Sequence, residues 1–220
     1  MPTKREAPRL DRAQVVDTAL RLLNEVGLDG LSLRLIAREL DVKAPALYWH
    51  FRNKRELLDE MATEMYRRMT DGRDEPPGAA GMTWRERTTA VARGLRSSLL
   101  AYRDGAKVFT GTRLTGTEHG TGMEANLRAL TDSGFTLEQA IRATTTVFTF
   151  VLGFVAEEQG MRTYPDDSRP AFDVTERARR LSGTPLAAEA GHYVFEGYDE
   201  AFEEGLALLV EGAAARYGVA

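Results

Sequence analysis

Apolar side chains recur every three to four residues through residues 11–70, which is the period of amphipathic α-helices. Asp11, followed three residues later by Gln14, has the pattern of a helix N-terminal capping box, and Gly27 ends the apolar run that follows. Ser32 is a favoured N-cap residue and precedes a second, shorter apolar run. The pattern therefore predicts one helix up to residue 26 and a short second helix after Ser32.

Two more helices are expected before residue 70. Asp41 and Val42 form a tight turn, and Pro45 suits the first turn of a helix, where its missing N–H costs no hydrogen bond. This third helix is short, from Ala44 to about Phe51. Asn53 then provides an N-cap for a fourth helix with an apolar face.

Residues 71–82 contain glycine, proline and acidic residues without periodicity, which is typical of a linker. This linker divides the chain into a head, residues 1–70, and a body, residues 71–220. Helices are expected in the body at Thr83–Tyr102, Ala106–Thr110, Met123–Ser133, Leu137–Gln159, Asp173–Leu181 and Ala190–Tyr217, the fifth of them weak and within a long loop. No strand-like alternation of any length occurs, so we expect an all-α protein with a three-helix helix-turn-helix head and a helical body.

The second and third helices have the spacing of a helix-turn-helix, in which the first helix braces on the DNA backbone and the second enters the major groove. Five apolar residues can bury the inner faces of the two helices: Leu35, Ile36, Leu40, Val42 and Leu47. Six residues are left for the groove side: Lys43, Ala44, Ala46, Tyr48, Trp49 and His50. Any helical hairpin shares this pattern, and the aromatic residues could instead fill the core, which is the reading we favour for Phe51.

Charge and composition add context. The net charge is −4, but residues 1–55 hold 11 Lys and Arg against 7 Asp and Glu, a net +4, which leaves −8 for the rest of the chain. A basic head on an acidic body fits a local DNA footprint, although chance asymmetry remains an alternative. The chain has no cysteine, no apolar run of 18 residues and no apolar segment near its N-terminus. We therefore expect a cytoplasmic protein without a membrane span.

The run ALRLLNEVGLDGLSLRLIARELDVKAPALYWHFRNKRELLDEM, residues 19–61, resembles the DNA-binding head of the TetR family of repressors. The resemblance continues through AYRDGAKVFTGTR (101–113) and LRALTDSGFT (127–136), and more thinly through LGFVAEEQ (152–159) and FEEGLALLVEG (202–212). It implies a homodimer in which the last two long helices of each subunit form a four-helix interface. It also implies a ligand tunnel in each effector-binding and dimerisation body, which controls the spacing of the two heads. The alternative is that both long helices are core helices of a monomer.

The resemblance also implies which residues contact operator DNA. Arg34, at the start of the second helix, is placed to reach a guanine or a phosphate, and Lys54 to hold a phosphate. The full set implied is Ser32, Arg34, Lys43, Ala44, Pro45, Ala46, Tyr48, Trp49, His50 and Lys54. Members that respond to tetracycline carry polar residues at positions 44 and 46. Since alanine donates no hydrogen bond, we expect a different operator here.

In those tetracycline-responsive members, the drug is held as a magnesium chelate by polar residues and two histidines. The matching positions here are Thr70 and Phe109. Apolar residues are expected to line the effector pocket, namely Met69, Val91, Leu95, Phe109, Met123, Leu127 and Phe148, with Thr112, Asn126 and Glu157 as polar groups. The alternative for each apolar residue is ordinary core. We predict a hydrophobic or aromatic effector and neither a metal nor a Mg²⁺–tetracycline site, since the three histidines form no ligand-spaced cluster.

Residues 103–107 lie beside this pocket and are the expected relay to the fourth helix. Two further interpretations stay open. In one, the body only dimerises and binds no ligand. In the other, the protein is an all-α enzyme, for which Glu157 and Glu158 are an acid–base candidate. Adjacent helical residues point apart, so we expect these two glutamates to be a surface pair.

Overall fold

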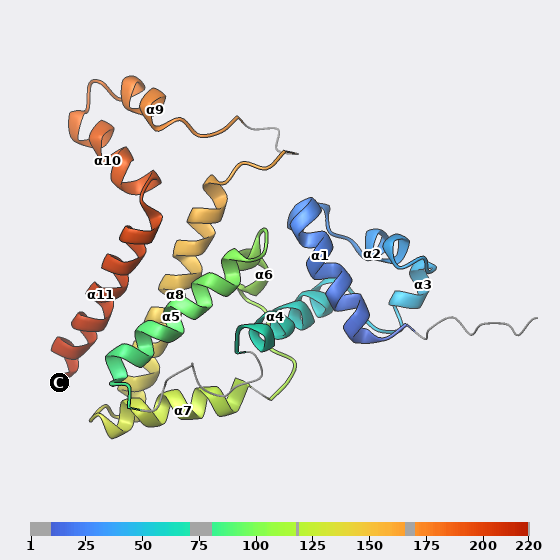
Figure 1. Cartoon of the computed structure of the whole chain (residues 1–220), viewed down its shortest axis with the longest axis horizontal. Helices are drawn as coiled ribbons and strands as arrows, with labels where there is room; N and C mark the ends of the chain where they lie inside the picture. Colours follow the sequence, from blue (N-terminus) through green and yellow to red (C-terminus); the bar gives the residue numbers. More distant parts are fainter. Residues whose placement is uncertain (1–9, 71–80, 118, 166–169, 220) are drawn as a thin grey trace, which may run out of the picture.

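The computed structural model describes residues 10–70, 81–117, 119–165 and 170–219, and within these ranges all regular structure is helical. The helices are α1 (Arg12–Gly30), α2 (Leu33–Glu39), α3 (Ala44–Leu47), α4 (Lys54–Thr70), α5 (Trp84–Leu100), α6 (Gly105–Phe109), α7 (His119–Asp132), α8 (Leu137–Met161), α9 (Val174–Arg180), α10 (Pro185–Phe195) and α11 (Tyr198–Tyr217). Figure 1 shows a head, α1 to α4, at one side and a body, α5 to α11, at the other. The prediction of an all-α fold is confirmed.

The predicted caps set the starts of the head helices. The Asp11 carboxylate accepts the Gln14 N–H at 2.7 Å, and the Asn53 side chain accepts the Glu56 N–H at 2.9 Å. α1 extends to Gly30, but it is kinked at Gly27. Gly27 has a non-helical φ of 68°, and it is the residue at which the apolar run ends. The head core is closed by large, fully buried side chains, namely Leu20, Leu23, Ile36, Leu47, Phe51 and Leu57. The interpretation of Phe51 as a core residue is confirmed.

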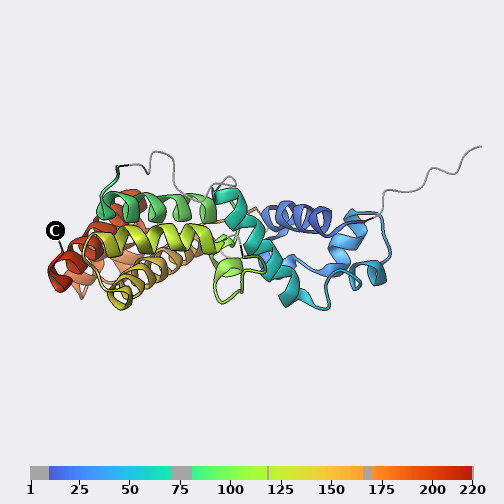
Figure 2. The same ribbon diagram turned by 90° about the horizontal axis from the view of Figure 1, so that it is seen from below.

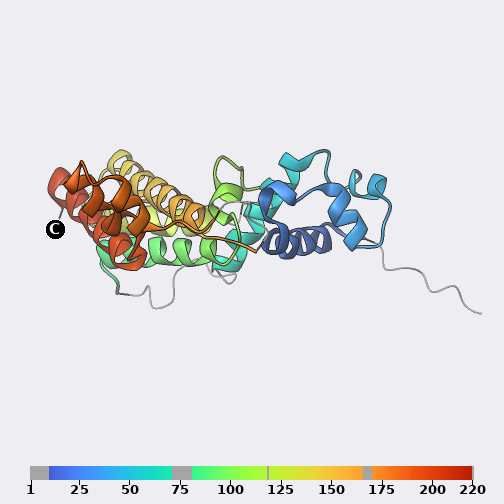
Figure 3. The ribbon, with the colours of Figure 1, turned by 90° about the horizontal axis from the view of Figure 1, so that it is seen from above.

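The body is built on α8, which packs against α5, α6, α7 and α11. In Figures 2 and 3 the body helices run alongside one another at one end of an elongated molecule, with the head at the other end. Val147, Val151 and Val155 of α8 lie in the shared core. Among the described helices, only α8 is long and apolar enough to cross a membrane by length and composition. Its packing against four neighbours places it in the body, although much of its apolar surface is left uncovered within the single chain.

Three predicted helix boundaries are wrong. The helix expected at Ala190–Tyr217 is two helices, α10 and α11, because Gly197 adopts φ 64° between them. α10 turns away to pack against α9, so only α11 runs along the body (Figure 1). α3 ends at Leu47 rather than near Phe51, and α7 begins at His119 rather than at Met123.

The glutamates at the end of α8 also differ from expectation. Glu157 is exposed, but Glu158 is buried and lies 2.9 Å from Arg96 of α5 and 3.2 Å from Arg162. They are therefore not a surface pair. The partner that permits burial of Glu158 is 62 residues away in the chain, so helical periodicity could not indicate it.

Candidate DNA interface and effector site

The turn between α2 and α3 fixes the candidate recognition segment. The Ser32 hydroxyl accepts the Leu35 N–H at 3.2 Å and so starts α2. Asp41 then adopts φ 52°, a left-handed conformation, and the Val42 N–H donates to the Ala37 carbonyl at 2.9 Å. Together these contacts close the turn and present α3 at the outer end of the head.

The predicted DNA-contact residues have mixed exposure. Trp49 is 90% exposed and Tyr48 is 53% exposed, although both are large aromatic residues. Ser32, Arg34, Lys43 and Pro45 are exposed, whereas Ala44, Ala46, His50 and Lys54 are half-buried. The structure therefore brings exposed cations and aromatic side chains together around α3, above a core closed by Leu47 and Phe51.

Two of these residues already have partners within the head. The Ser32 hydroxyl caps α2, and the Lys54 ammonium donates to the Leu28 carbonyl at 2.7 Å. An ammonium group carries three donors, so this bond leaves Lys54 able to bind a phosphate as well. Lys54 thus links the end of α1 to the start of α4, a contact that the sequence did not indicate.

Arg12 of α1 holds in place the residues that follow α3. Its guanidinium donates to the His50 carbonyl at 2.8 Å and lies 4.5 Å from the centre of the Phe51 ring. It also lies 3.4 Å from the Glu56 carboxylate and 3.2 Å from that of Glu60. The Arg52 N–H, and then Arg12, hold the pKa of Glu56 below its ordinary value. Arg12 therefore fixes the end of this segment to α1 and α4, a role with no local sequence signal.

The head is joined to the body at the turn between α5 and α6. Asp104, at φ 58°, accepts the Leu28 N–H at 2.9 Å and lies 2.8 Å from the Lys107 ammonium. Burial acts to raise the pKa of Asp104, but the bonds from Lys107 and Leu28 outweigh it and lower that pKa. The neighbouring Arg103 N–H donates to the Asn24 side chain at 2.7 Å. The end of α1 is thus held directly by this turn.

A second joint connects α4 to the loop after α6. The Asp59 carboxylate accepts the Arg113 N–H at 2.9 Å, and the Thr63 hydroxyl accepts the Thr115 N–H at 2.8 Å. Arg55 of α4 also donates to the Gly111 carbonyl. Both helices that frame the head, α1 and α4, are therefore bonded to the segment around α6.

Gln159 of α8 holds the turn between α5 and α6 from the body side. Its amide nitrogen donates to the carbonyls of Leu99 at 3.0 Å and Tyr102 at 2.7 Å, and its oxygen accepts the Ala106 N–H at 3.1 Å. At Gly105 in the same turn, a Cβ would lie 2.2 Å from the Leu99 carbonyl oxygen, so no side chain fits there. The role of Gln159 could not be predicted from the sequence, because a lone polar residue near a helix end does not indicate three hydrogen bonds to a distant turn.

The predicted effector residues are only partly brought together. Phe109 and Phe148 have ring centres 6.3 Å apart. The Asn126 amide lies 3.3 Å from the Thr144 hydroxyl, whereas the Thr112 hydroxyl donates to the Phe109 carbonyl at 2.7 Å. Of the others, Leu95 is buried, Met69, Thr70 and Leu127 are half-buried, and Val91, Met123 and Glu157 are exposed. Four cavities among the described residues are lined by other side chains.

No group of three or more metal-ligating side chains occurs among the described residues. His50, His119 and His192 stand on separate segments, and Thr70 and Phe109 are the residues at the positions where the family resemblance implies the two histidines. Thr70 and Phe109 therefore offer no imidazole ligand to a magnesium chelate.

A helix-turn-helix with exposed cations and aromatic residues, joined by specific bonds to an all-α body, defines a DNA-binding regulator. Residues 15–61 match the bacterial regulatory proteins of the tetR family, and residues 76–217 match the tetracyclin repressor-like C-terminal domain. The chain belongs to the TetR family of transcriptional regulators, which are not enzymes.

Several known proteins align with nearly the whole of this chain. It is 41% identical over 212 residues to tetracycline repressor protein class A from transposon 1721 of Escherichia coli, covering 94% of this chain and 92% of that protein. A possible TetR family transcriptional regulator from Streptomyces coelicolor A3(2) has a TM-score of 0.80 at 39% identity, over 93% of this chain and 99% of the other. TetR (class A) in complex with 5a,6-anhydrotetracycline and magnesium has a TM-score of 0.67 at 38% identity, over 94% and 99%.

Proposed function

We propose that this protein is a homodimeric repressor that binds a palindromic operator and is released from it by a small hydrophobic or aromatic effector. The observation that carries this proposal is the bonded path from α8 to the recognition head. Gln159 holds the turn between α5 and α6, and that turn holds the end of α1 through Asp104. DNA binding in a bacterium supports a cytoplasmic location.

The head supports DNA reading. Lys43 and Arg34 supply exposed positive charge beside α3, and Trp49 and Tyr48 project large aromatic surfaces into solvent. Exposed aromatic and cationic side chains around a recognition helix suit contacts with phosphates and base edges. Ala44 and Ala46 at its start can contact thymine methyl groups but donate no hydrogen bond, so the operator is expected to differ from that of the tetracycline repressors.

Exposed faces on α8 and α11 support dimerisation. Only 28% of the apolar stretch of α8 is buried within the single chain. On α11, Leu208 is 69% exposed. A Cβ added at Gly153 or Gly160 of α8, or at Gly212 of α11, would meet nothing within 4 Å. A glycine inside a helix lowers helix stability by about 1 kcal/mol relative to alanine. Because these glycines have open space beside them within the chain, we infer that a partner helix packs closely against them.

The effector is expected to be apolar and metal-free. The rings of Phe109 and Phe148 lie in tilted contact, and Asn126 with Thr144 supplies a small polar pair. A few polar groups on an apolar wall suit an aromatic ligand. The relative bound to 5a,6-anhydrotetracycline and magnesium gives a direct comparison, since Thr70 and Phe109 replace the two histidines expected of a magnesium-chelate site.

The DNA-binding part of the proposal is tested by selecting duplexes from a random library with the purified protein. A dimeric repressor should enrich a two-fold symmetric sequence with half-sites about one helical turn apart. Enrichment of a single unrepeated half-site would contradict the dimeric reading.

The effector part is tested on the selected operator. Anhydrotetracycline with and without Mg²⁺, and a panel of aromatic compounds without metal, are added while fluorescence anisotropy reports operator binding. Release by a metal-free aromatic compound supports the proposal. Release only by the magnesium–drug complex would contradict it, and no release by any compound would favour the alternative of a body that only dimerises.

A further inference from the structure

The outer surface of the body carries a ladder of ion pairs between α5 and α11. Its rungs are Arg96 with Asp199 at 2.7 Å, Arg93 with Glu203 at 2.6 Å, and Arg85 with Glu211 at 3.0 Å. The acidic residues of α11 that form these pairs stand at positions 199, 203 and 211, so a step of four residues between them is interrupted at Ala207. Across from it, α5 presents Thr89. Two small side chains therefore occupy the level at which another rung would fit.

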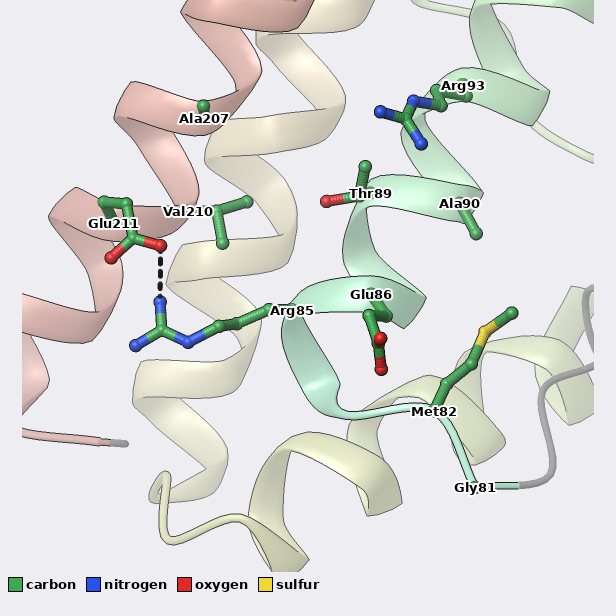
Figure 4. A pocket seen from close by; sticks show the side chains of 10 residues that line it. All are labelled: Gly81, Met82, Arg85, Glu86, Thr89, Ala90, Arg93, Ala207, Val210 and Glu211. Carbon is green, nitrogen blue, oxygen red and sulfur yellow. Dashed lines mark hydrogen bonds and ion pairs between the residues drawn. The ribbon is translucent and has the colours of Figure 1, made fainter.

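An open cavity of about 590 Å³ lies at this missing rung. Figure 4 shows Arg85 reaching across to Glu211 on one side and Arg93 on the other, with Thr89 pointing toward α11 between them. Val210, which is 5% exposed, and Ala207 form an apolar wall. The cavity therefore combines an apolar surface with two guanidinium groups, each of which is paired with a glutamate, and the Glu86 carboxylate also lines it.

Hydrogen-bond donors remain available around this cavity. Glu203 accepts from Nε and Nη2 of Arg93, which leaves Nη1 without a partner among the described residues. Arg85 donates through Nη1 to Glu211, whose side chain is 71% exposed. The Thr89 hydroxyl donates to no carbonyl in the described chain, unlike that of Thr63, which bonds the carbonyl four residues earlier.

These donors match a carboxylate. The bond from Arg93 lowers the pKa of Glu203, so the neighbouring rung is ionised at neutral pH and its two charges balance. Guanidinium groups bind carboxylates with well-defined geometry, and their affinity rises beside apolar surface. A free carboxylate at the level of Ala207 would take the place of the missing acidic side chain, while an apolar group attached to it would rest on Val210.

We propose that the gap between Arg85 and Arg93 is a second ligand site, which takes a small organic acid with an apolar body. The carboxylate lies between the two guanidinium groups and accepts from the Thr89 hydroxyl. The site is on the outside of the body, apart from the effector residues around Phe109. It therefore does not depend on the proposed effector chemistry.

The test uses the full-length protein and 4-fluorobenzoate, whose binding is followed by ¹⁹F NMR line broadening. Neutral 4-fluorobenzyl alcohol is the comparison probe. Ala207→Glu supplies the missing carboxylate from the protein itself and should weaken benzoate binding by about tenfold or more, since it occupies the same donors. The control is Ala13→Glu, the same change at an exposed position of α1, and should leave binding unchanged. Thr89→Val should weaken binding by several-fold while keeping the size of the side chain.

Equal binding of the acid and the alcohol would overturn the proposal, because the site would then not recognise a carboxylate. Benzoate binding that survives Ala207→Glu would overturn it too, since the ligand would occupy another part of the body. No binding below about 10 mM, which is weaker than about −3 kcal/mol, would have the same consequence. The thermal midpoint of each variant verifies that it is folded.

Discussion

Single residues in left-handed conformations have opposite roles in this protein. Asp41 adopts φ 52° in the turn before α3, and its carboxylate makes no hydrogen bond to the described residues. Glycine reaches this conformation without the steric cost that other residues have. We expect Asp41→Gly to raise the free energy of unfolding by about 0.5–1 kcal/mol, measured by urea denaturation.

Asp104 provides the matched control, since it has φ 58° but also holds the Leu28 N–H and the Lys107 ammonium. Asp104→Gly should therefore lower the free energy of unfolding despite the relief of strain. If both glycine variants were destabilised alike, relief of backbone strain at Asp41 would not determine the stability of the Asp41→Gly variant.

A buried side-chain amide gives a second prediction for a single residue. Gln159→Leu keeps most of the side-chain volume but removes three hydrogen bonds and leaves the Ala106 N–H without its acceptor. We expect a loss of about 2 kcal/mol in the free energy of unfolding. The nearby exposed Glu157→Leu is the control and should change stability little. An equal loss in both variants would mean that the three bonds of Gln159 contribute nothing specific.

The contact between α1 and the turn before α6 should depend on pH. The pKa of Asp104 is lowered in the folded protein, so its ionised form contributes stability above the unfolded value of about 4 and loses it as pH falls through the folded pKa. Asp104→Asn tolerates the same left-handed backbone but cannot be ionised. The stability advantage of the wild type over this variant should be largest near neutral pH and shrink as pH falls below about 4. An advantage that does not change with pH would contradict the assignment.

Loss of a cation from the head should have different effects at the start of α2, where Arg34 lies, and at the start of α4, where Lys54 lies. Lys54→Ala is expected to weaken binding to all DNA sequences, because a phosphate contact carries no sequence information. Arg34→Ala is expected to relax preference at one base pair by about 1–3 kcal/mol. Fluorescence anisotropy on the operator and on random duplex distinguishes the two. Equal losses on both DNAs for both variants would refute the assignment. Because Lys54 also bonds Leu28, its variant is checked for folding by circular dichroism.

At the scale of elements, the sequence predicts helix starts and ends best where the residues that set them are close together in the chain. The caps at Asp11, Ser32 and Asn53 were readable because the residues involved lie within three positions of one another. Gly197 was not recognised as a helix end, since a single glycine in an apolar run is often tolerated within a helix.

Contacts between distant segments were the part of the candidate site that sequence could not supply. The bonds of Gln159 to the turn before α6, of Glu158 to Arg96 and of Arg12 to His50 join residues 38 to 62 positions apart. No periodicity or spacing encodes such pairs. They depend on how helices pack, and they are the contacts through which the body can act on the head.

At the scale of the whole molecule, one subunit has only one recognition head, so a symmetric operator needs two. We expect Leu208→Glu to place a charge in the proposed dimer interface and convert the protein to a monomer of 24.4 kDa in light scattering. Val91→Glu, a charge at a 40% exposed position of α5, is the control and should remain dimeric.

Operator affinity then separates dimerisation from folding. In the Leu208→Glu monomer each head binds its half-site alone, so the gain from holding both heads on one DNA is lost, and affinity for the full operator should fall by about 10²-fold or more. Affinity for an isolated half-site should not change, because the recognition helix lies at the far end of the molecule from α11 (Figure 2). A variant that stays dimeric would place the interface elsewhere. A monomer that keeps full operator affinity would mean that the two heads act independently, and that the spacing of the heads cannot be the quantity an effector controls.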